Sequence, residues 1–87
     1  MELSQRAFKY LNSLDKHLQE RLKLGLKKLE TNPISSDSKF ICRHEGEQVF
    51  RIRIGDHRAL YKVKYDQKII LITKLDKIPR VYRHGDI

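Results

Sequence analysis

The feature that most constrains this chain is a two-strand pattern between residues 49 and 63. Apolar and basic residues alternate along its first half, Val49-Phe50-Arg51-Ile52-Arg53-Ile54, as in a strand with one buried and one polar face. Gly55-Asp56 follows, and glycine supplies the positive φ that short hairpin loops require. The pattern therefore predicts an antiparallel hairpin with a two-residue loop.

The register of this hairpin predicts one basic face and one apolar face. A two-residue loop pairs Ile54 with His57, and it places Arg53 directly opposite Arg58. Like charges opposite each other across strands are unfavourable, so this face calls for an anionic partner. The other face is expected to belong to the core. It carries Phe50, Ile52, Ile54, Ala59, Tyr61 and Val63.

Length and composition limit what such a chain can be. Its 87 residues are enough for one domain with a modest core, so we expect a single domain over residues 1–87. No apolar run approaches the roughly 20 residues that span a membrane, and the polar start of the chain does not fit a signal peptide. The single cysteine, Cys42, cannot form an internal disulfide. These features favour a reducing, cytoplasmic setting.

The net charge of +8 is unevenly distributed. Residues 1–47 hold nine Lys/Arg against seven Asp/Glu, whereas residues 48–87 hold ten against four. The excess over the expected sheet and tail points to nucleic acid or an acidic protein as partner, with a merely solvated basic surface as the alternative. The four histidines and the lone cysteine lack the spacing of a metal site, so we expect no metal and no cofactor.

The segments before the hairpin predict two helices that cover the sheet. Ser4 is a suitable N-cap for a helix over residues 4–14, and Asp15 is suitable for a second helix that ends at Thr31-Asn32-Pro33. Gly25 within the second helix lowers helix propensity unless it allows close packing. The two apolar faces carry Ala7, Phe8, Leu11 and Leu14, and Leu18, Leu22, Leu26 and Leu29.

Further strands are expected on both sides of the hairpin. Residues 39–43 predict a short strand, and the apolar residues 68–73 predict a strand at the centre of the sheet. A strand at the N-terminus is expected to be very short or missing, and the basic tail begins at Lys74. The predicted fold class is α+β, with an N-terminal helical hairpin packed on a small antiparallel sheet of three to four strands.

At this point the chain resembles the RelE/ParE superfamily of toxins from type II toxin–antitoxin systems. The resemblance is carried by an aromatic residue followed by Arg-Ile-Arg-Ile-Gly-Asp, an arginine and a tyrosine, here Phe50 to Tyr61. An Arg-Ala pair opens the first helix, and the basic end holds Val81-Tyr82-Arg83. The resemblance covers nearly the whole chain and implies the same α+β fold.

Within the superfamily, the basic face and the terminal tyrosine resemble the RelE branch more than the ParE branch. This implies an mRNA endonuclease that acts with the ribosome, inhibits translation and is neutralised by a RelB-like antitoxin. Operator DNA would be bound only together with that antitoxin, and no membrane is implied. The alternative is a ParE-like inhibitor of DNA gyrase, or an inactive homologue that acts only by binding. A basic RNA-binding domain without catalysis is a third interpretation.

The implied reaction is attack of a ribose 2′-hydroxyl on the adjacent phosphodiester, which needs no metal if the protein moves the protons and neutralises the phosphorane. Arg51, Arg53 and Arg58 match the family's basic positions on the hairpin. They are assigned to phosphate binding and transition-state stabilisation, because a guanidinium stays charged and can bind phosphate at two points.

The other residues implied by the resemblance lie in the basic tail, apart from Lys62 on the hairpin. Tyr82 matches the C-terminal tyrosine, as a base or as a stacking partner for a nucleobase. The basic position before it is assigned to Arg80, with Lys77 as the second choice. The expected RNA-binding residues are Lys62, Lys74, Lys77 and Arg83.

Overall fold

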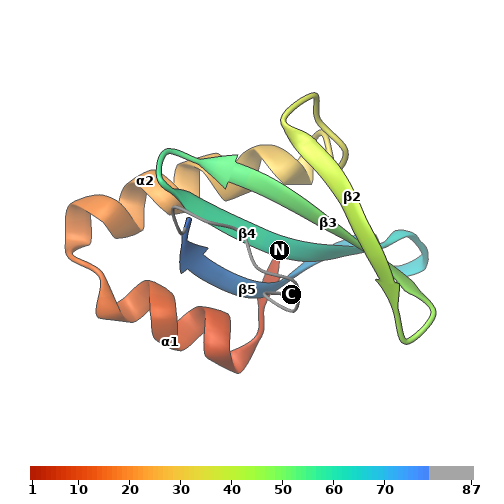
Figure 1. Cartoon of the computed structure of the whole chain (residues 1–87), viewed down its shortest axis with the longest axis horizontal. Helices are drawn as coiled ribbons and strands as arrows, with labels where there is room; N and C mark the ends of the chain where they lie inside the picture. Colours follow the sequence, from red (N-terminus) through yellow and green to blue (C-terminus); the bar gives the residue numbers. More distant parts are fainter. Residues whose placement is uncertain (79–87) are drawn as a thin grey trace.

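A five-stranded sheet and two helices make up the computed structural model, which describes residues 1–78. The strands are β1 (Glu2–Leu3), β2 (Ser38–His44), β3 (Glu47–Ile54), β4 (His57–Lys64) and β5 (Ile69–Lys77). The helices are α1 (Gln5–Ser13) and α2 (Lys16–Lys27), and 3-10 turns follow α2 (Lys28–Glu30) and β4 (Tyr65–Gln67). In Figure 1, α2 passes behind the sheet and α1 lies beside β5.

Both helices begin where the sequence predicts. The Ser4 hydroxyl accepts a hydrogen bond from the Ala7 amide at 3.2 Å, and the Asp15 carboxylate accepts one from the Leu18 amide at 2.9 Å. Each bond satisfies an amide that has no partner within its helix. Neither helix in residues 1–78 is both long and apolar enough to span a bilayer.

Most of the apolar helical residues that were expected in the core are buried there. Phe8 was expected in the core as well, but 54% of its surface is exposed. Ala7 and Leu11 are one turn apart and both point at the sheet, so Phe8, about 100° further round α1, points away from it. The buried helical residues are Ala7, Leu11, Leu22, Leu26 and Leu29.

The β3–β4 hairpin has the two-residue turn that its sequence predicts, and β2 and β3 are joined by a second tight turn. Ile54 pairs with His57 and Arg53 with Arg58, and the intervening loop starts at Gly55 with φ +62°. The β2–β3 loop consists of Glu45 and Gly46, with φ angles of 53° and 79°. Two consecutive positive φ angles are typical of a type I′ turn, which matches the twist of the strands.

The sheet differs from the predicted one in three ways. The order is β1-β5-β4-β3-β2, so β4 is central and β5 lies next to the two-residue β1. β1 pairs with β5 in parallel, which makes the sheet mixed and five-stranded. β5 also continues to Lys77, into what the sequence indicated as tail, because it pairs with the whole of β4 through a register shift at Leu60 and Tyr61.

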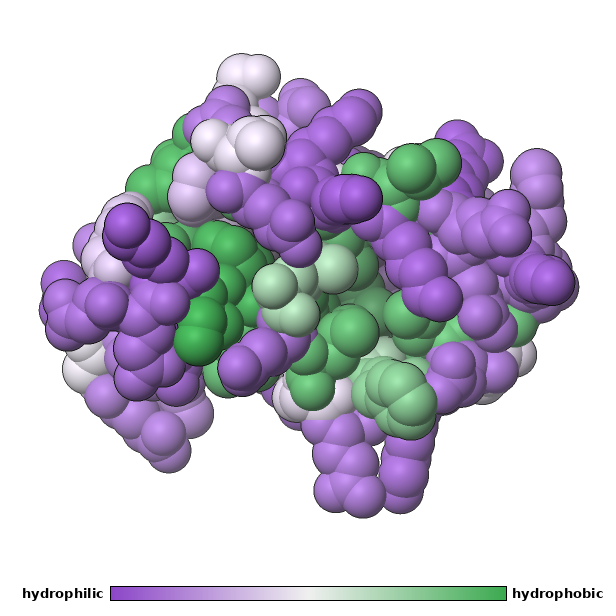
Figure 2. Space-filling view, turned by 180° about the vertical axis from the view of Figure 1, so that it is seen from behind, coloured by the Kyte–Doolittle hydropathy of each residue, from purple (hydrophilic) through white to green (hydrophobic). Residues whose placement is uncertain are grey.

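The core lies between the helices and one face of the sheet. The predicted core face of the hairpin is confirmed for Phe50, Ile52, Ala59 and Tyr61, which join the leucines of both helices in one cluster. Tyr65 continues the spacing of Tyr61 and Val63 but is 60% exposed, because β4 ends at Lys64 and the alternation ends with it. Figure 2 shows the side away from the viewer in Figure 1, where apolar residues gather across the middle between hydrophilic borders.

Candidate nucleic-acid interface

The sheet face opposite the helices carries the basic residues of the hairpin. We call it the outer face. It comprises Val49, Arg51 and Arg53 of β3, Arg58, Leu60 and Lys62 of β4, and Lys74 and Asp76 of β5. Side chains alternate along each strand, and the intervening residues of these strands point into the core, so this arrangement follows directly from the strand register.

A bidentate ion pair lies at one end of the outer face. Arg58 and Asp76 are directly opposite each other on β4 and β5. Arg58 Nε donates to Asp76 Oδ1 at 2.8 Å, and Arg58 Nη2 donates to Asp76 Oδ2 at 3.0 Å. Only 6% of Arg58 is exposed. The anionic partner that the sequence predicts for the facing arginines is therefore supplied in part by the chain itself.

Asp76 also contacts a second cation of the outer face. Lys74 Nζ lies 3.7 Å from Asp76 Oδ2, and both side chains are about one quarter exposed, at 26% and 25%. The sequence reasoning did not identify Asp76 as a site residue, because it placed residues 74–77 in a tail rather than in β5. The signal that could have revealed it is the antiparallel β4–β5 register, which brings residues 58 and 76 together.

The remaining hairpin arginines lie beside this pair on β3. Arg53 is exposed and is the cross-strand neighbour of Arg58, as predicted. Arg51 is partly buried and lies opposite Leu60. Lys77 is exposed at the end of β5, opposite His57. The structure therefore brings the three predicted arginines together on one face. The predicted residues Arg80, Tyr82 and Arg83 lie outside the described part of the chain.

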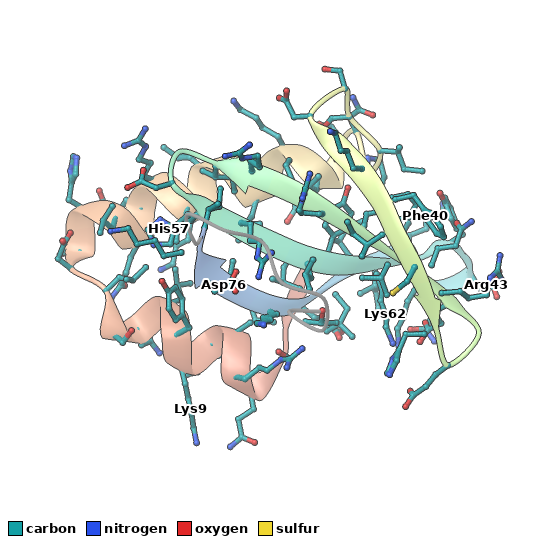
Figure 3. The ribbon with its side chains drawn as sticks, viewed as in Figure 1. Lys9, Phe40, Arg43, His57, Lys62 and Asp76 are labelled. Atoms are coloured by element: carbon teal, nitrogen blue, oxygen red, sulfur yellow. The ribbon has the colours of Figure 1, made fainter. Side chains whose placement is uncertain are left out.

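Lys62 occupies the other end of the outer face, as the labels in Figure 3 show. It is 8% exposed, and its ammonium lies 3.4 Å from Glu47 Oε1 and 3.5 Å from His44 Nδ1. Lys64 Nζ lies 3.9 Å from the other oxygen of Glu47. Lys62, which the sequence predicts to bind RNA, therefore lies on the outer face with its charge beside the Glu47 carboxylate.

A cavity of about 450 Å³ opens between the start of α1 and the end of β2. Its lining combines apolar residues of the outer face, Val49 and Leu60, with the basic residues Arg6 and Lys62. Arg6 Nε donates to the Thr73 carbonyl at 2.7 Å, which holds the arginine beside β5. A lining that combines apolar and cationic residues suits a nucleobase and its phosphate. The sequence did not single out Arg6 as a binding residue, because only the parallel pairing of β1 and β5 brings it here.

Tyr10 and Tyr61 have raised pKa values, so neither is suited to act as a general base. Burial, and secondly the negative charge of Asp76, raises the pKa of Tyr10 above its usual 10.0. Burial raises the pKa of Tyr61 as well. Both phenols therefore stay protonated at neutral pH and cannot act as general bases there. Within residues 1–78 no three His, Cys, Asp or Glu side chains are grouped so that they could hold a metal ion.

A helical hairpin packed on a small sheet with a basic outer face is also found in a known family of proteins. The family model of the ParE toxin of type II toxin–antitoxin systems (parDE) matches residues 1–82. The chain therefore belongs to the RelE/ParE superfamily of toxins.

Individual relatives place the chain on the RelE-like side of this superfamily. It is 33% identical to the putative toxin RelE1 of Methanocaldococcus jannaschii, over 97% of this chain and 94% of that protein. The archaeal RelE–RelB complex from Pyrococcus horikoshii OT3 contains a similar chain, with a TM-score of 0.78 and 28% identity, over 92% of this chain and 94% of that one. The isolated E. coli RelE toxin shares the fold, with a TM-score of 0.71 and 20% identity, over 92% of this chain and 84% of that one.

Proposed function

We propose that this toxin is a ribosome-dependent mRNA endonuclease of the RelE type, which acts in the cytoplasm and inhibits translation. The observation that carries the proposal is the outer face, where Arg51, Arg53 and Arg58 lie together with Lys62 and Lys74. Such a concentration of cations on one sheet face is suited to binding a phosphate backbone.

The chemistry suits arginines on a rigid sheet. The 2′-oxygen of a ribose forms a bond to the adjacent phosphorus, the bond to the 5′-oxygen breaks, and the products are a cyclic phosphate and a 5′-hydroxyl. One proton leaves the nucleophile and one reaches the leaving oxygen. Guanidinium groups of the outer face would neutralise the charge that accumulates on the phosphorane. Tyr82 remains the proposed base or stacking partner for a nucleobase, and Arg80, with Lys77 as the second choice, remains the proposed cation at the basic position before it.

The proposed macromolecular partners are the ribosome with its mRNA, and a RelB-like antitoxin. The P. horikoshii relative was solved as a complex with RelB, and the resemblance covers 92% of this chain and 94% of the relative. The net charge of +8 makes an acidic antitoxin electrostatically complementary.

The decisive experiment is toeprinting of a defined mRNA in a reconstituted translation reaction. Wild-type protein is compared with Arg53→Ala and Lys9→Ala, which make the same change in net charge. Arg53 is exposed on the outer face, whereas Lys9 projects from α1 away from the sheet (Figure 3). Arg53 is a cleaner choice than Arg58, because replacing the buried Arg58 would remove the bidentate partner of Asp76.

We expect wild type and Lys9→Ala to cut within the ribosomal A-site codon, and Arg53→Ala to cut roughly 100- to 1,000-fold more slowly, as for loss of one group that stabilises the transition state. Intact mRNA on active ribosomes would exclude the endonuclease. Equal slowing by both variants would show that the effect is one of overall charge rather than of the outer face.

A second candidate function is favoured by the family model, which describes ParE toxins. In this case the protein would poison DNA gyrase rather than cut mRNA. Gyrase-dependent double-strand breaks in a supercoiled plasmid, absent when gyrase is omitted, would identify it. Gyrase that turns over normally with the protein in excess would eliminate it.

A further inference from the structure

The outer face contains a carboxylate at the position where a polyanion is proposed to bind. Asp76 lies among Arg53, Arg58 and Lys74, and it reduces the net charge of this group from +3 to +2. Electrostatic attraction alone would favour an uncharged residue at this position, because a carboxylate repels phosphate. The geometry of Asp76 indicates what it does instead.

We propose that Asp76 is a positioning residue, whose carboxylate fixes the orientation of the Arg58 guanidinium on the outer face. The inference rests on the proposed function, because the ligand that Arg58 is positioned for is RNA phosphate. Asp76 itself does not contact the RNA in this proposal. Its negative charge lowers the affinity of the outer face for RNA, but its two hydrogen bonds define the geometry of Arg58.

The first argument is the form of the contact. Arg58 engages Asp76 through both Nε and Nη2, at 2.8 and 3.0 Å, so the plane of the guanidinium is fixed as well as its distance. The two residues are direct partners on adjacent antiparallel strands, so the backbone ladder holds both ends of the pair. Lys74 Nζ lies 3.7 Å from Asp76 Oδ2, the oxygen that Arg58 Nη2 also contacts, so a second cation holds the carboxylate in place.

The second argument is what Arg58 would meet without Asp76. Arg53 is its direct cross-strand neighbour on the same face, and two guanidinium groups in this relation repel each other. Arg58 is 6% exposed, so it cannot relieve this repulsion by moving fully into water. The carboxylate therefore stabilises the arrangement that places both arginines on one face.

The positioning role predicts that loss of the Asp76 charge has opposite effects on RNA binding and on RNA cleavage. Removing the charge of Asp76 makes the outer face more positive, so RNA should bind at least as tightly and with a steeper salt dependence. The cleavage step should nevertheless slow, because Arg58 no longer presents a fixed guanidinium. A residue needed only for folding would weaken both quantities together, and a carboxylate that is merely inhibitory would speed cleavage when removed.

The test uses Asp76→Asn, Asp76→Ala and Asp76→Glu, with Asp56→Asn as control. Asp56 is exposed in the β3–β4 loop, so its change to Asn alters the net charge equally without touching the Arg58 pair. Two quantities are measured for each protein. One is the Kd for a short single-stranded RNA with 2′-O-methyl groups, at several salt concentrations. The other is the single-turnover cleavage rate on mRNA-loaded ribosomes at saturating toxin.

We expect Asp76→Asn and Asp76→Ala to bind the RNA as tightly as wild type or more tightly, and to cleave at least about 10-fold more slowly, as for a misplaced catalytic group. Asp76→Glu should recover part of the rate because it keeps the charge, and Asp56→Asn should cleave like wild type. Cleavage by Asp76→Asn at or above the wild-type rate would overturn the proposal. A joint fall in RNA affinity, cleavage and thermal midpoint would also overturn it, in favour of a structural role.

A spectroscopic measurement separates this inference from the proposed function. In wild type the Nε–H resonance of Arg58 should be shifted downfield and slow to exchange with solvent, and the shift should disappear in Asp76→Asn. Adding the methylated RNA should perturb this resonance in wild type. If wild type cleaves no mRNA, the proposed function fails, but a perturbed Arg58 resonance that depends on Asp76 still supports the positioning role. An Arg58 resonance that is the same in wild type and Asp76→Asn would refute it.

Discussion

At the scale of the residue, Tyr61 shows how one buried polar group ties the chain together. Its side chain is fully buried, and its ring stacks on Phe50 with centroids 5.7 Å apart. Its hydroxyl donates to the Pro33 carbonyl at 2.6 Å and forms a second hydrogen bond with Ser38 Oγ at 2.7 Å. The phenol thus fastens the loop after α2 and the start of β2 to the central strand.

We expect Tyr61→Phe to lower the free energy of unfolding at pH 7 by about 1–3 kcal/mol, because buried partners lose their hydrogen bonds. Burial raises the pKa of the phenol above 10.0, so the folded state holds this proton more tightly than the unfolded state. The stabilisation is then complete below about pH 10 and is lost as pH rises through the folded pKa. Urea unfolding from pH 7 to pH 11 should show a smaller alkaline decline in Tyr61→Phe than in wild type.

The matched control for this measurement is Tyr65→Phe. Tyr65 is 60% exposed, so its replacement should change neither the stability at pH 7 nor the alkaline decline appreciably. If the two variants behaved alike, the alkaline loss of stability would not come from the buried phenol.

At the scale of the element, the N-cap residues of the two helices make different numbers of hydrogen bonds. Asp15 accepts one bond, from the Leu18 amide. Ser4 accepts from the Ala7 amide and also donates to the Thr73 carbonyl of β5 at 2.8 Å, so it joins α1 to the sheet. We expect Asp15→Ala to cost about 1 kcal/mol, and Ser4→Ala roughly 1 kcal/mol more. Urea unfolding of both variants measures this, and equal costs would show that the Ser4–Thr73 bond adds nothing.

Close packing of α2 on the hairpin depends on Gly25. A Cβ at this position would lie 2.8 Å from Ile54 Cδ1 and 2.9 Å from both Cγ1 and Cγ2, so Ile54 or the helix would have to shift to admit it. The sequence left open whether this glycine only costs helix propensity or allows close packing, and the structure shows close packing.

We expect Gly25→Ala to destabilise the protein by about 1–3 kcal/mol, although alanine improves helix propensity by up to about 1 kcal/mol. Thermal unfolding of a double-mutant cycle with Ile54→Ala checks the cause, because removing the larger side chain should restore part of the loss. Additive effects in the cycle would mean that the two residues do not clash.

At the scale of the whole molecule, the position of a charge should matter more than the total of +8. Arg53→Ala should reduce the slope of log K against log salt for single-stranded RNA by about 0.7, the value for loss of one phosphate contact. Lys9→Ala makes the same change in net charge on α1 and should leave the slope nearly unchanged. Fluorescence anisotropy at several salt concentrations measures both, and identical slopes in the two variants would rule out the outer face as the RNA site.

The local parts of the fold followed from the sequence because they depend on neighbouring residues. Ser4 and Asp15 marked the starts of the helices, since a side-chain cap acts within three residues. The loop Gly55-Asp56 set the register that places Arg53 opposite Arg58, since a two-residue loop allows only one pairing. By itself the sequence therefore determined the α+β class, the hairpin and its basic face.

The long-range parts were decided only in the tertiary structure. The pairing of β1 with β5 brings Arg6 beside Thr73, although the two are 67 positions apart in the chain. The register of β5 brings Asp76 onto Arg58, although the intervening segment is a turn and a strand with a register shift. No local rule specifies these pairings, because they depend on how the helices and strands pack around one shared core. The sequence thus determined that the outer face is basic, and only the tertiary structure decided which cation the carboxylate would hold.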